Sequence, residues 1–206
     1  MKKKLITALL FVSLFFILTD CKKSDDPQEE FLASEVAETK HAVLEDYTGV
    51  RCGFCPDGHE IAQELIDLYG NSVVVLGVNA GSYADPSSNW ANFTTPYGSA
   101  FISLAMPGGY PNGSVNRVKP TGASTPGTSM GRTQWKTASE AIMTEESPVN
   151  IGAKATFNST NRELTIKVDL YYIADGNGAN KLNIALLQSG MVANQSGGGP
   201  NYVHKH

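Results

Sequence analysis

Two cysteines, Cys52 and Cys55, are separated by Gly53 and Phe54 and are followed at once by Pro56. In a pair with this spacing, the thiolate of the first cysteine attacks a disulfide and the second thiol resolves the mixed disulfide. Cys52 is the expected nucleophile, because it should sit at an exposed tip, and Cys55 is the expected buried resolving thiol. The spacing therefore indicates thiol–disulfide exchange on protein disulfides.

An apolar strand and an amphipathic helix flank the cysteine pair. Residues 42–47 predict a strand, and residues 59–69 predict a helix with Ile61, Leu65 and Leu68 on one apolar stripe. The proline after the second cysteine lacks an N–H and fits best in the first helical turn, so the helix should begin at the cysteines. Strand, Cys-x-x-Cys and helix in this order are typical of a thioredoxin-like site, where the helix N-terminus acidifies a thiol.

Further residues are candidates for supporting roles. The positive charge of Arg51, next to the pair, should favour a thiolate. His59, one helical turn further on, either acts as a nearby proton acceptor or cation, or is an ordinary exposed surface residue. Thioredoxin-like folds place a cis-proline loop against the cysteines as part of a substrate groove. Tyr110–Pro111 is the candidate for that loop, with Pro107 as the alternative.

Two other interpretations of the cysteine pair stay open. A zinc site would need two more ligands, but the chain has no other cysteine nearby and no spacing joins its four histidines to the pair. We therefore predict no metal site, and no cofactor motif is visible. A permanent structural disulfide is the stronger alternative, although so short a loop gives little entropic stabilisation. Glu45 and Asp46, just before the pair, are expected to be solvated strand-end residues.

The N-terminus predicts export and lipidation. Lys2, Lys3 and Lys4 precede an apolar run from Leu5 to Leu18, and Cys21 follows shortly after. That run has the length of a signal peptide and is short for a membrane span. Residues 1–20 are therefore interpreted as a lipoprotein signal peptide and Cys21 as the lipidated residue, which anchors the chain in a membrane. Residues 21–40, polar and acidic, predict a flexible tether.

Charge and cysteine usage narrow the partners and the compartment. The formal net charge is −4, and loss of residues 1–20 would make it −6. With no basic patch, nucleic acid is not expected as a partner. One cysteine for a lipid and two for a redox pair account for all three cysteines, which suits an oxidising compartment outside the cytoplasm.

The remaining patterns predict two domains, an α/β thioredoxin-like domain at 41–146 followed by a β-rich domain at 147–206. In the first, residues 73–78 read as a strand buried on both faces, 87–106 as weak helix and 132–144 as helix. In the second, period-2 alternation predicts antiparallel strands with one apolar face, arranged as in a β-sandwich. These three predicted strands are 149–157, 164–172 and 181–187.

The motif residues resemble those of the Omp-twenty-eight-related outer-membrane lipoproteins of Bacteroidetes-type bacteria. The matching segments are Val43–Gly49, Cys52–Glu60, Gly109–Gly113 with Asn116–Arg117, and Gln195 with Asn201–His204. The resemblance implies a thioredoxin-like domain and a β-rich domain on a lipid-anchored outer-membrane protein, with the cell surface as one possible face. Members continue with further strand beyond this point, so the β-rich domain is expected to be truncated at His206.

Two functional hypotheses follow. In the first, the protein is a membrane-anchored thiol–disulfide oxidoreductase in which Cys52 attacks, Cys55 resolves and Pro111 shapes the substrate groove. In the second, it is a non-enzymatic surface lipoprotein that binds a partner or host ligand on a thioredoxin-like scaffold. The direction of electron flow is not set by Cys-x-x-Cys spacing, because potentials differ widely among proteins that share it.

Overall fold

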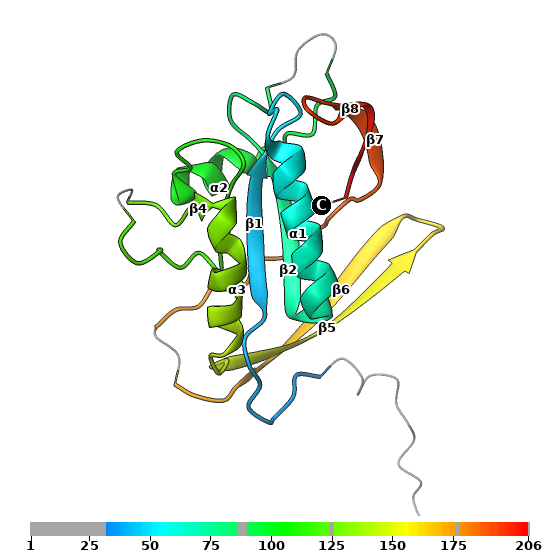
Figure 1. Cartoon of the computed structure of the whole chain (residues 1–206). Coiled ribbons are helices and arrows are strands. Elements are labelled where there is room, and N and C mark those ends of the chain that lie inside the picture. Colours follow the sequence, from blue (N-terminus) through cyan, green and yellow to red (C-terminus); the bar gives the residue numbers. More distant parts are fainter. Residues whose placement is uncertain (1–31, 86–89, 124–125, 176–177, 206) are drawn as a thin grey trace, which may run out of the picture.

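The computed structural model describes residues 32–85, 90–123, 126–175 and 178–205, as an α/β arrangement with one mixed sheet and two antiparallel pairs (Figure 1). The mixed sheet is formed by β1 (Ala42–Thr48), β2 (Val73–Asn79), β3 (Asn112–Val115) and β4 (Met130–Gly131). The helices are α1 (Cys55–Tyr69), α2 (Gly98–Ala105), α3 (Trp135–Met143) and the short 3-10 turns η2 (Gly70–Ser72) and η3 (Arg132–Gln134). The C-terminal strands are β5 (Val149–Asn158), β6 (Glu163–Tyr172), β7 (Met191–Gln195) and β8 (Gly199–His204).

The mixed sheet has the strand order β2-β1-β3-β4. β1 runs parallel to β2, with Leu44 opposite Val75, and antiparallel to β3, with Leu44 also opposite Val115. The parallel pair is joined by α1, as a parallel connection requires a crossover. β1 is therefore the central strand, and the cysteine loop follows directly from its end.

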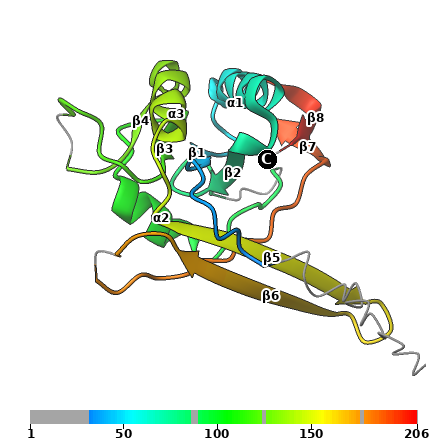
Figure 2. The ribbon, with the colours of Figure 1, turned by 90° about the horizontal axis from the view of Figure 1, so that it is seen from below.

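Alternation along β1 sends successive side chains to opposite faces. Ala42 and Leu44 are fully buried in the core with residues of α1 and α3, so these two helices cover one face of the sheet (Figure 2). By the same alternation Asp46 and Thr48 point toward that face. Tyr47 points to the opposite face.

Helix α1 begins at Cys55, as the proline after it predicts, and has Pro56 in its first turn. Its buried residues are Cys55, Gly58, Ala62 and Leu65. The predicted apolar stripe is only partly right, since Leu68 is 61% exposed. The helix is rotated so that the small residues Gly58 and Ala62 are buried together with Leu65, and Gly58 packs closely on Pro111.

Two predictions for the first domain need correction. The strand at 73–78 was expected to be buried on both faces, but β2 lies at the edge of the sheet and Val74 is 40% exposed while Val73 and Val75 are buried. Of the range 87–106, expected to have weak helical character, the described residues 90–106 form one helix, α2, from Gly98 to Ala105. The helix predicted at 132–144 forms as η3 followed by α3.

The C-terminal segment differs more from the prediction. β5 and β6 form the expected hairpin, but residues 181–187 form no strand, and β7 pairs with β8 instead. The two pairs lie apart (Figure 1), so the described residues do not build the sandwich-like sheet expected from the pattern. A segment of alternating apolar and polar residues forms a β-strand only where another strand can pair with it. Here Leu182, Ile184 and Leu186 remain at least half exposed.

The two ends of the segment 41–146 meet. Thr39 forms an isolated antiparallel bridge with Glu146, and the Lys40 amide donates to the Glu145 carbonyl at 2.8 Å. The Lys40 ammonium also lies 2.6 Å from the Glu145 carboxylate, and the Ser147 amide donates to the Glu38 carbonyl. The chain therefore enters and leaves this segment at one place, although the predicted domain boundaries stay a prediction.

The described part of the predicted tether contacts the β5–β6 hairpin. The Ala33 amide donates to the Asp169 carboxylate at 2.9 Å, and the Asn150 side-chain amide donates to the carbonyls of Ser34 and Val36. Residues 33–36 are thus fixed by these hydrogen bonds and are not part of a flexible tether. The predicted signal peptide at 1–20 and Cys21 lie outside the described residues.

Within the described ranges, no helix combines the length and the apolar character that crossing a membrane requires.

Candidate functional site

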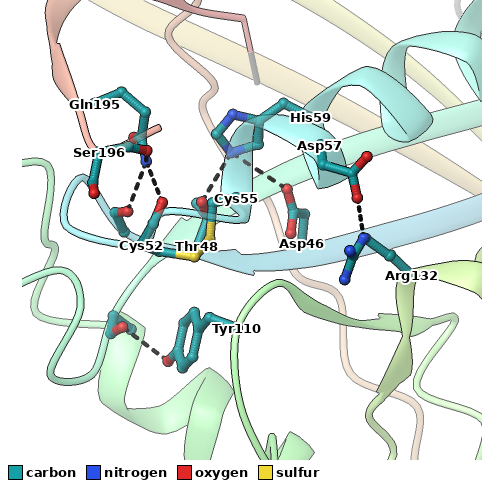
Figure 3. Close-up of a disulfide and its surroundings, with 12 residues drawn as sticks. Asp46, Thr48, Cys52, Cys55, Asp57, His59, Tyr110, Arg132, Gln195 and Ser196 are labelled. Atoms are coloured by element: carbon teal, nitrogen blue, oxygen red, sulfur yellow. Dashed lines mark hydrogen bonds and ion pairs between the residues drawn. A yellow bond between two sulfur atoms is a disulfide. The ribbon is translucent and has the colours of Figure 1, made fainter. Parts of the chain in front are cut away.

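Cys52 and Cys55 are joined in a disulfide at the start of α1, with their Cα atoms 5.4 Å apart (Figure 3). Cys55 is fully buried, as expected for a resolving thiol. Cys52, expected at an exposed tip, is only 2% exposed, whereas Phe54 between the cysteines is 71% exposed. The exposure prediction for Cys52 is wrong, because other segments of the chain pack over the loop.

The loop that carries Cys52 is closed by backbone hydrogen bonds. The Cys52 amide donates to the Gly49 carbonyl at 2.9 Å, and the Cys55 amide donates to the Cys52 carbonyl at 3.3 Å. Arg51 is exposed, and its guanidinium donates to the Ser82 carbonyl at 2.5 Å. Arg51 thus ties the loop to residue 82. Its positive charge lies just before the N-terminus of α1, and the charge and the helix N-terminus would each favour a thiolate.

The Tyr110–Pro111 peptide bond, for which the sequence predicts the cis form, is cis in the structure. Pro111 packs on the first turn of α1 so closely that a Cβ added to Gly58 would lie 2.8 Å from the Pro111 Cβ. Tyr110 lies on one side of the disulfide and its hydroxyl donates to the Ala80 carbonyl at 2.8 Å (Figure 3). No such bond precedes Pro107. The role of Pro111 in a substrate groove stays a prediction.

Asp46, which the sequence analysis expected to be a solvated strand-end residue, is instead enclosed beside the site, so that prediction is wrong. It is fully buried on β1, and neither carboxylate oxygen accepts a hydrogen bond from the described residues. Burial raises the pKa of this carboxyl from 3.8 to about 8. The group therefore holds its proton at neutral pH. The available signal was its position on the strand, since Asp46 alternates with Ala42 and Leu44 and so shares their buried face.

His59 is not the exposed surface residue that one interpretation allowed, since its side chain is 11% exposed. Its Nε2 lies 2.8 Å from the Thr48 hydroxyl and 3.7 Å from Asp46 Oδ2. Its Nδ1 is hydrogen-bonded to the Tyr202 hydroxyl at 2.8 Å. The imidazole thus links β1, α1 and β8 beside the buried carboxyl (Figure 3).

Residues from the distant β7–β8 hairpin complete the site. The side-chain amide of Gln195 donates to the Cys52 carbonyl at 2.8 Å and to the Gly49 carbonyl at 3.2 Å. The Ser196 amide donates to the Val50 carbonyl at 2.8 Å. Spacing along the chain gave no hint of these contacts, although Gln195 belongs to the weakest segment of the family resemblance.

A second cluster stabilises the opposite face of β1. The Tyr47 hydroxyl donates to Glu45 at 2.7 Å, and Arg117 donates to the same carboxylate at 2.7 Å. Glu45, expected to be solvated, is 5% exposed. Burial is the main cause that raises the pKa of Tyr47, which keeps this hydroxyl neutral. This cluster lies across β1 from the disulfide and has a structural role.

The described part of the chain holds no cluster of three or more histidine, cysteine or acidic side chains arranged to bind a metal ion.

Comparisons with known proteins found a structural similarity to one solved structure. The chain matches no protein-family profile and no curated protein. Among solved structures, it is similar to HBP35 of Porphyromonas gingivalis, with a TM-score of 0.51 and 24% sequence identity. The match covers 82% of this chain and 55% of that one, so the chain spans about half the length of its structural neighbour. This likeness concerns the fold alone, and the specific family resemblance stays a prediction.

Proposed function

We propose that the protein is a thiol–disulfide oxidoreductase of the cell envelope, with Cys52 and Cys55 as the redox centre of a thioredoxin-like domain. The observation that carries the proposal is the position of the disulfide. It lies at the N-terminus of α1, with Tyr110 of the cis-proline loop on one side and the buried Asp46 carboxyl nearby on β1 (Figure 3). Its substrates would be thiols or disulfides of other envelope proteins.

Electron transfer in this site proceeds by two exchanges. A substrate thiolate attacks Cys52 Sγ, the bond between the two cysteines breaks, and Cys55 leaves as a thiolate. A second substrate thiolate then attacks the mixed disulfide and releases Cys52. The substrate leaves as a disulfide, and the cysteine pair has gained two electrons and two protons. In the opposite direction, Cys52 attacks a substrate disulfide and Cys55 resolves it.

Asp46 supplies the proton at the buried end of the pair. A Cys55 thiolate released beneath the first turn of α1 cannot be neutralised by bulk water, because Cys55 is fully buried. The Asp46 carboxyl, with a pKa raised to about 8 by burial, still carries its proton at neutral pH and can donate it. His59, 3.7 Å from that carboxylate, can return the proton from the outside.

The test is a redox titration of the chain from Lys22 onward against glutathione, together with Cys52→Ser and Cys55→Ser variants. A potential between about −120 and −270 mV would place the pair among exchange catalysts. Cys52→Ser should abolish exchange with a protein disulfide, whereas Cys55→Ser should trap a mixed disulfide through Cys52. A potential below about −300 mV, with unchanged behaviour of Cys52→Ser, would contradict the proposal.

A second function is favoured by the 2% exposure of Cys52. A covered disulfide suits a non-enzymatic lipoprotein that binds a partner on a thioredoxin-like scaffold. In that case, a Cys52→Ser/Cys55→Ser double variant would retain partner binding in pull-downs from envelope fractions. Loss of every such interaction in the double variant would speak for the redox function.

The proposal includes a lipid anchor at Cys21 in the outer membrane, on the periplasmic side or the cell surface. It rests on the Lys2–Lys4 and Leu5–Leu18 pattern and on the family resemblance. Metabolic labelling with a palmitate analogue should mark the wild-type protein and leave Cys21→Ala unlabelled. Equal labelling of both would remove Cys21 as the modified residue.

A further inference from the structure

We infer that the β7–β8 hairpin is a displaceable cover over the Cys52–Cys55 disulfide, and that thiols reach Cys52 only when its turn lifts away. The inference rests on the proposed function in one respect, namely that the disulfide is the reacting group. It adds a regulated access step that the cysteine motif alone does not contain.

The cover makes three polar contacts with the cysteine loop, all near the turn of the hairpin. The Gln195 side chain donates to the carbonyls of Cys52 and Gly49, and the Ser196 amide donates to the Val50 carbonyl. These bonds hold the backbone on both sides of Arg51. Figure 3 shows Gln195 and Ser196 on the opposite side of the disulfide from Tyr110.

The turn also packs directly on the residue that follows Cys52. Gly197 has a φ of +79°, and a Cβ added to it would lie 2.1 Å from the Gly53 carbonyl oxygen. No larger residue fits there without moving the turn or the loop. The glycine thus brings the turn directly against the residue next to Cys52, which is itself only 2% exposed.

Along β8, the hairpin contacts α1 and the loop that carries Phe93. The Tyr202 hydroxyl bonds to His59 Nδ1 at 2.8 Å, and the buried His204 ring packs on Phe93 with ring centroids 4.8 Å apart. Tyr202 thus connects the cover to the imidazole beside Asp46, so lifting the hairpin also releases one partner of His59.

The hairpin is built so that it can move as a unit. β7 and β8 pair with each other and with no other described strand, and an isolated two-stranded hairpin is only marginally stable in water. Val192 and Val203 on its outer side are 63% and 46% exposed. The segment that leads into it, 178–190, has no regular secondary structure. The contacts described above, at the turn and along β8, are therefore among those that hold it against the rest of the chain.

The experiment measures how fast dithiothreitol reduces the disulfide in the folded chain from Lys22 onward. Samples are quenched with acid, free thiols are alkylated, and the mass shift is followed over time. One dithiothreitol thiolate attacks Cys52 Sγ and Cys55 leaves, after which the second thiol releases Cys52 and closes the oxidised ring. The reducing electrons thus come from the reagent, and no physiological partner is needed.

Two variants weaken the cover and two serve as matched controls. Gly197→Ala introduces the clash with Gly53, whereas Gly199→Ala places the same side chain at another positive φ, of +92°, with open space around it. Gln195→Ala removes the side-chain bonds to the loop, whereas Ser196→Ala keeps the backbone bond to Val50.

Gly197→Ala and Gln195→Ala should be reduced about tenfold faster than wild type, the effect of losing one or two hydrogen bonds. Both controls should stay within about threefold of wild type. The inference is overturned if Gly197→Ala and Gln195→Ala react as slowly as their controls while circular dichroism shows the native fold. If a cover variant fails to fold, hydrogen exchange of the wild-type protein tests the inference instead. A displaceable cover requires the Ser196 amide to exchange faster than the amides of β1, and equally slow exchange would overturn the inference.

Failure of this inference and failure of the proposed function can be told apart. A structural disulfide with a very low potential would still show the difference between the variants and their controls. An active redox centre without a cover would show exchange with protein substrates and equal reduction rates in all variants.

Discussion

At the scale of single residues, the buried carboxyl of Asp46 has the clearest physical consequences. Its side chain is completely enclosed, and His59 Nε2 lies 3.7 Å from its carboxylate. Tyr202 also feels this carboxylate, since burial first, and then Glu60 and Asp46, raise the pKa of its hydroxyl. Such an enclosed acid is costly to ionise, so it keeps its proton, as the proposed proton donation requires.

Asp46→Asn should stabilise the protein at neutral and alkaline pH. The folded state keeps the Asp46 proton up to a pKa of about 8, whereas the unfolded state loses it near 3.8, so stability falls as pH rises between these values. We expect the variant to gain about 2–4 kcal/mol at pH 8 and much less at pH 4, after allowance for burying the amide. Urea denaturation of both proteins at the two pH values measures the difference. An equal difference at both would show that Asp46 is ionised in the folded protein.

Arg117→Met should destabilise the fold by about 1–3 kcal/mol, because it leaves the Glu45 carboxylate buried without its cation. The lower part of the range applies because the Arg117 side chain is 36% exposed and solvent screens the pair. Thermal denaturation gives the loss. The double variant Glu45→Gln/Arg117→Met is the control, and it should regain most of the stability that the single variant loses. If it regains none, Arg117 stabilises the fold through its packing on Phe101 instead.

At the scale of elements, α1 and the cis-proline loop are fitted to each other through Gly58. Alanine is the better helix former by about 1 kcal/mol, so Gly→Ala within a helix ordinarily stabilises it. Here the new methyl group would meet Pro111 at 2.8 Å. The packing against the loop, and not helix propensity, therefore decides the residue at this position.

Gly58→Ala should consequently destabilise the protein by about 1–3 kcal/mol, against the usual sign for a helix. Chemical denaturation monitored by tryptophan fluorescence measures this loss, since Trp135 is fully buried in the same core. Ser139→Ala in α3 provides a reference for a buried helix position without a clash. A stabilised Gly58→Ala variant would show that Pro111 can retreat without cost.

The elements also show what the sequence could and could not predict. Local rules were sufficient for α1, because Pro56 and the cysteines mark its start, and for β5–β6, whose strands alternate regularly. The prediction of a strand at 181–187 is wrong because alternation indicates that one face could be buried, and does not indicate whether another strand is present to pair with it. Gln195 and Tyr202 could not be placed at the site, since contacts across more than 140 residues leave no local pattern.

At the scale of the whole molecule, the main core does not depend on the C-terminal hairpin. The buried apolar cluster extends from Ala42 to Ile142 and includes no residue of β5 to β8. The hairpin β7–β8 contributes side chains to the disulfide site, but it adds none to this cluster. Stability and access to the cysteines are thus located in different parts of the chain.

A chain ending at Gly190 should therefore keep the core and lose the cover. We expect its free energy of unfolding to fall by about 1–3 kcal/mol, from the loss of a few hydrogen bonds and aromatic contacts. Urea denaturation and the near-UV signal of Trp135 report on the core. If this shortened chain lost cooperative unfolding altogether, the hairpin would have to be counted as part of the folding unit.

The meeting of the two ends at Lys40 and Glu145 has a mechanical consequence. A pull between the N-terminal segment and β5 would be carried by the Thr39–Glu146 bridge, the Lys40–Glu145 contacts and the bond from Ser147 to Glu38. It would not run along β1, and the geometry around Cys52 would feel no strain until those bonds gave way. A tension applied to the leading segment would thus pass into the C-terminal part of the protein and leave the disulfide site undisturbed.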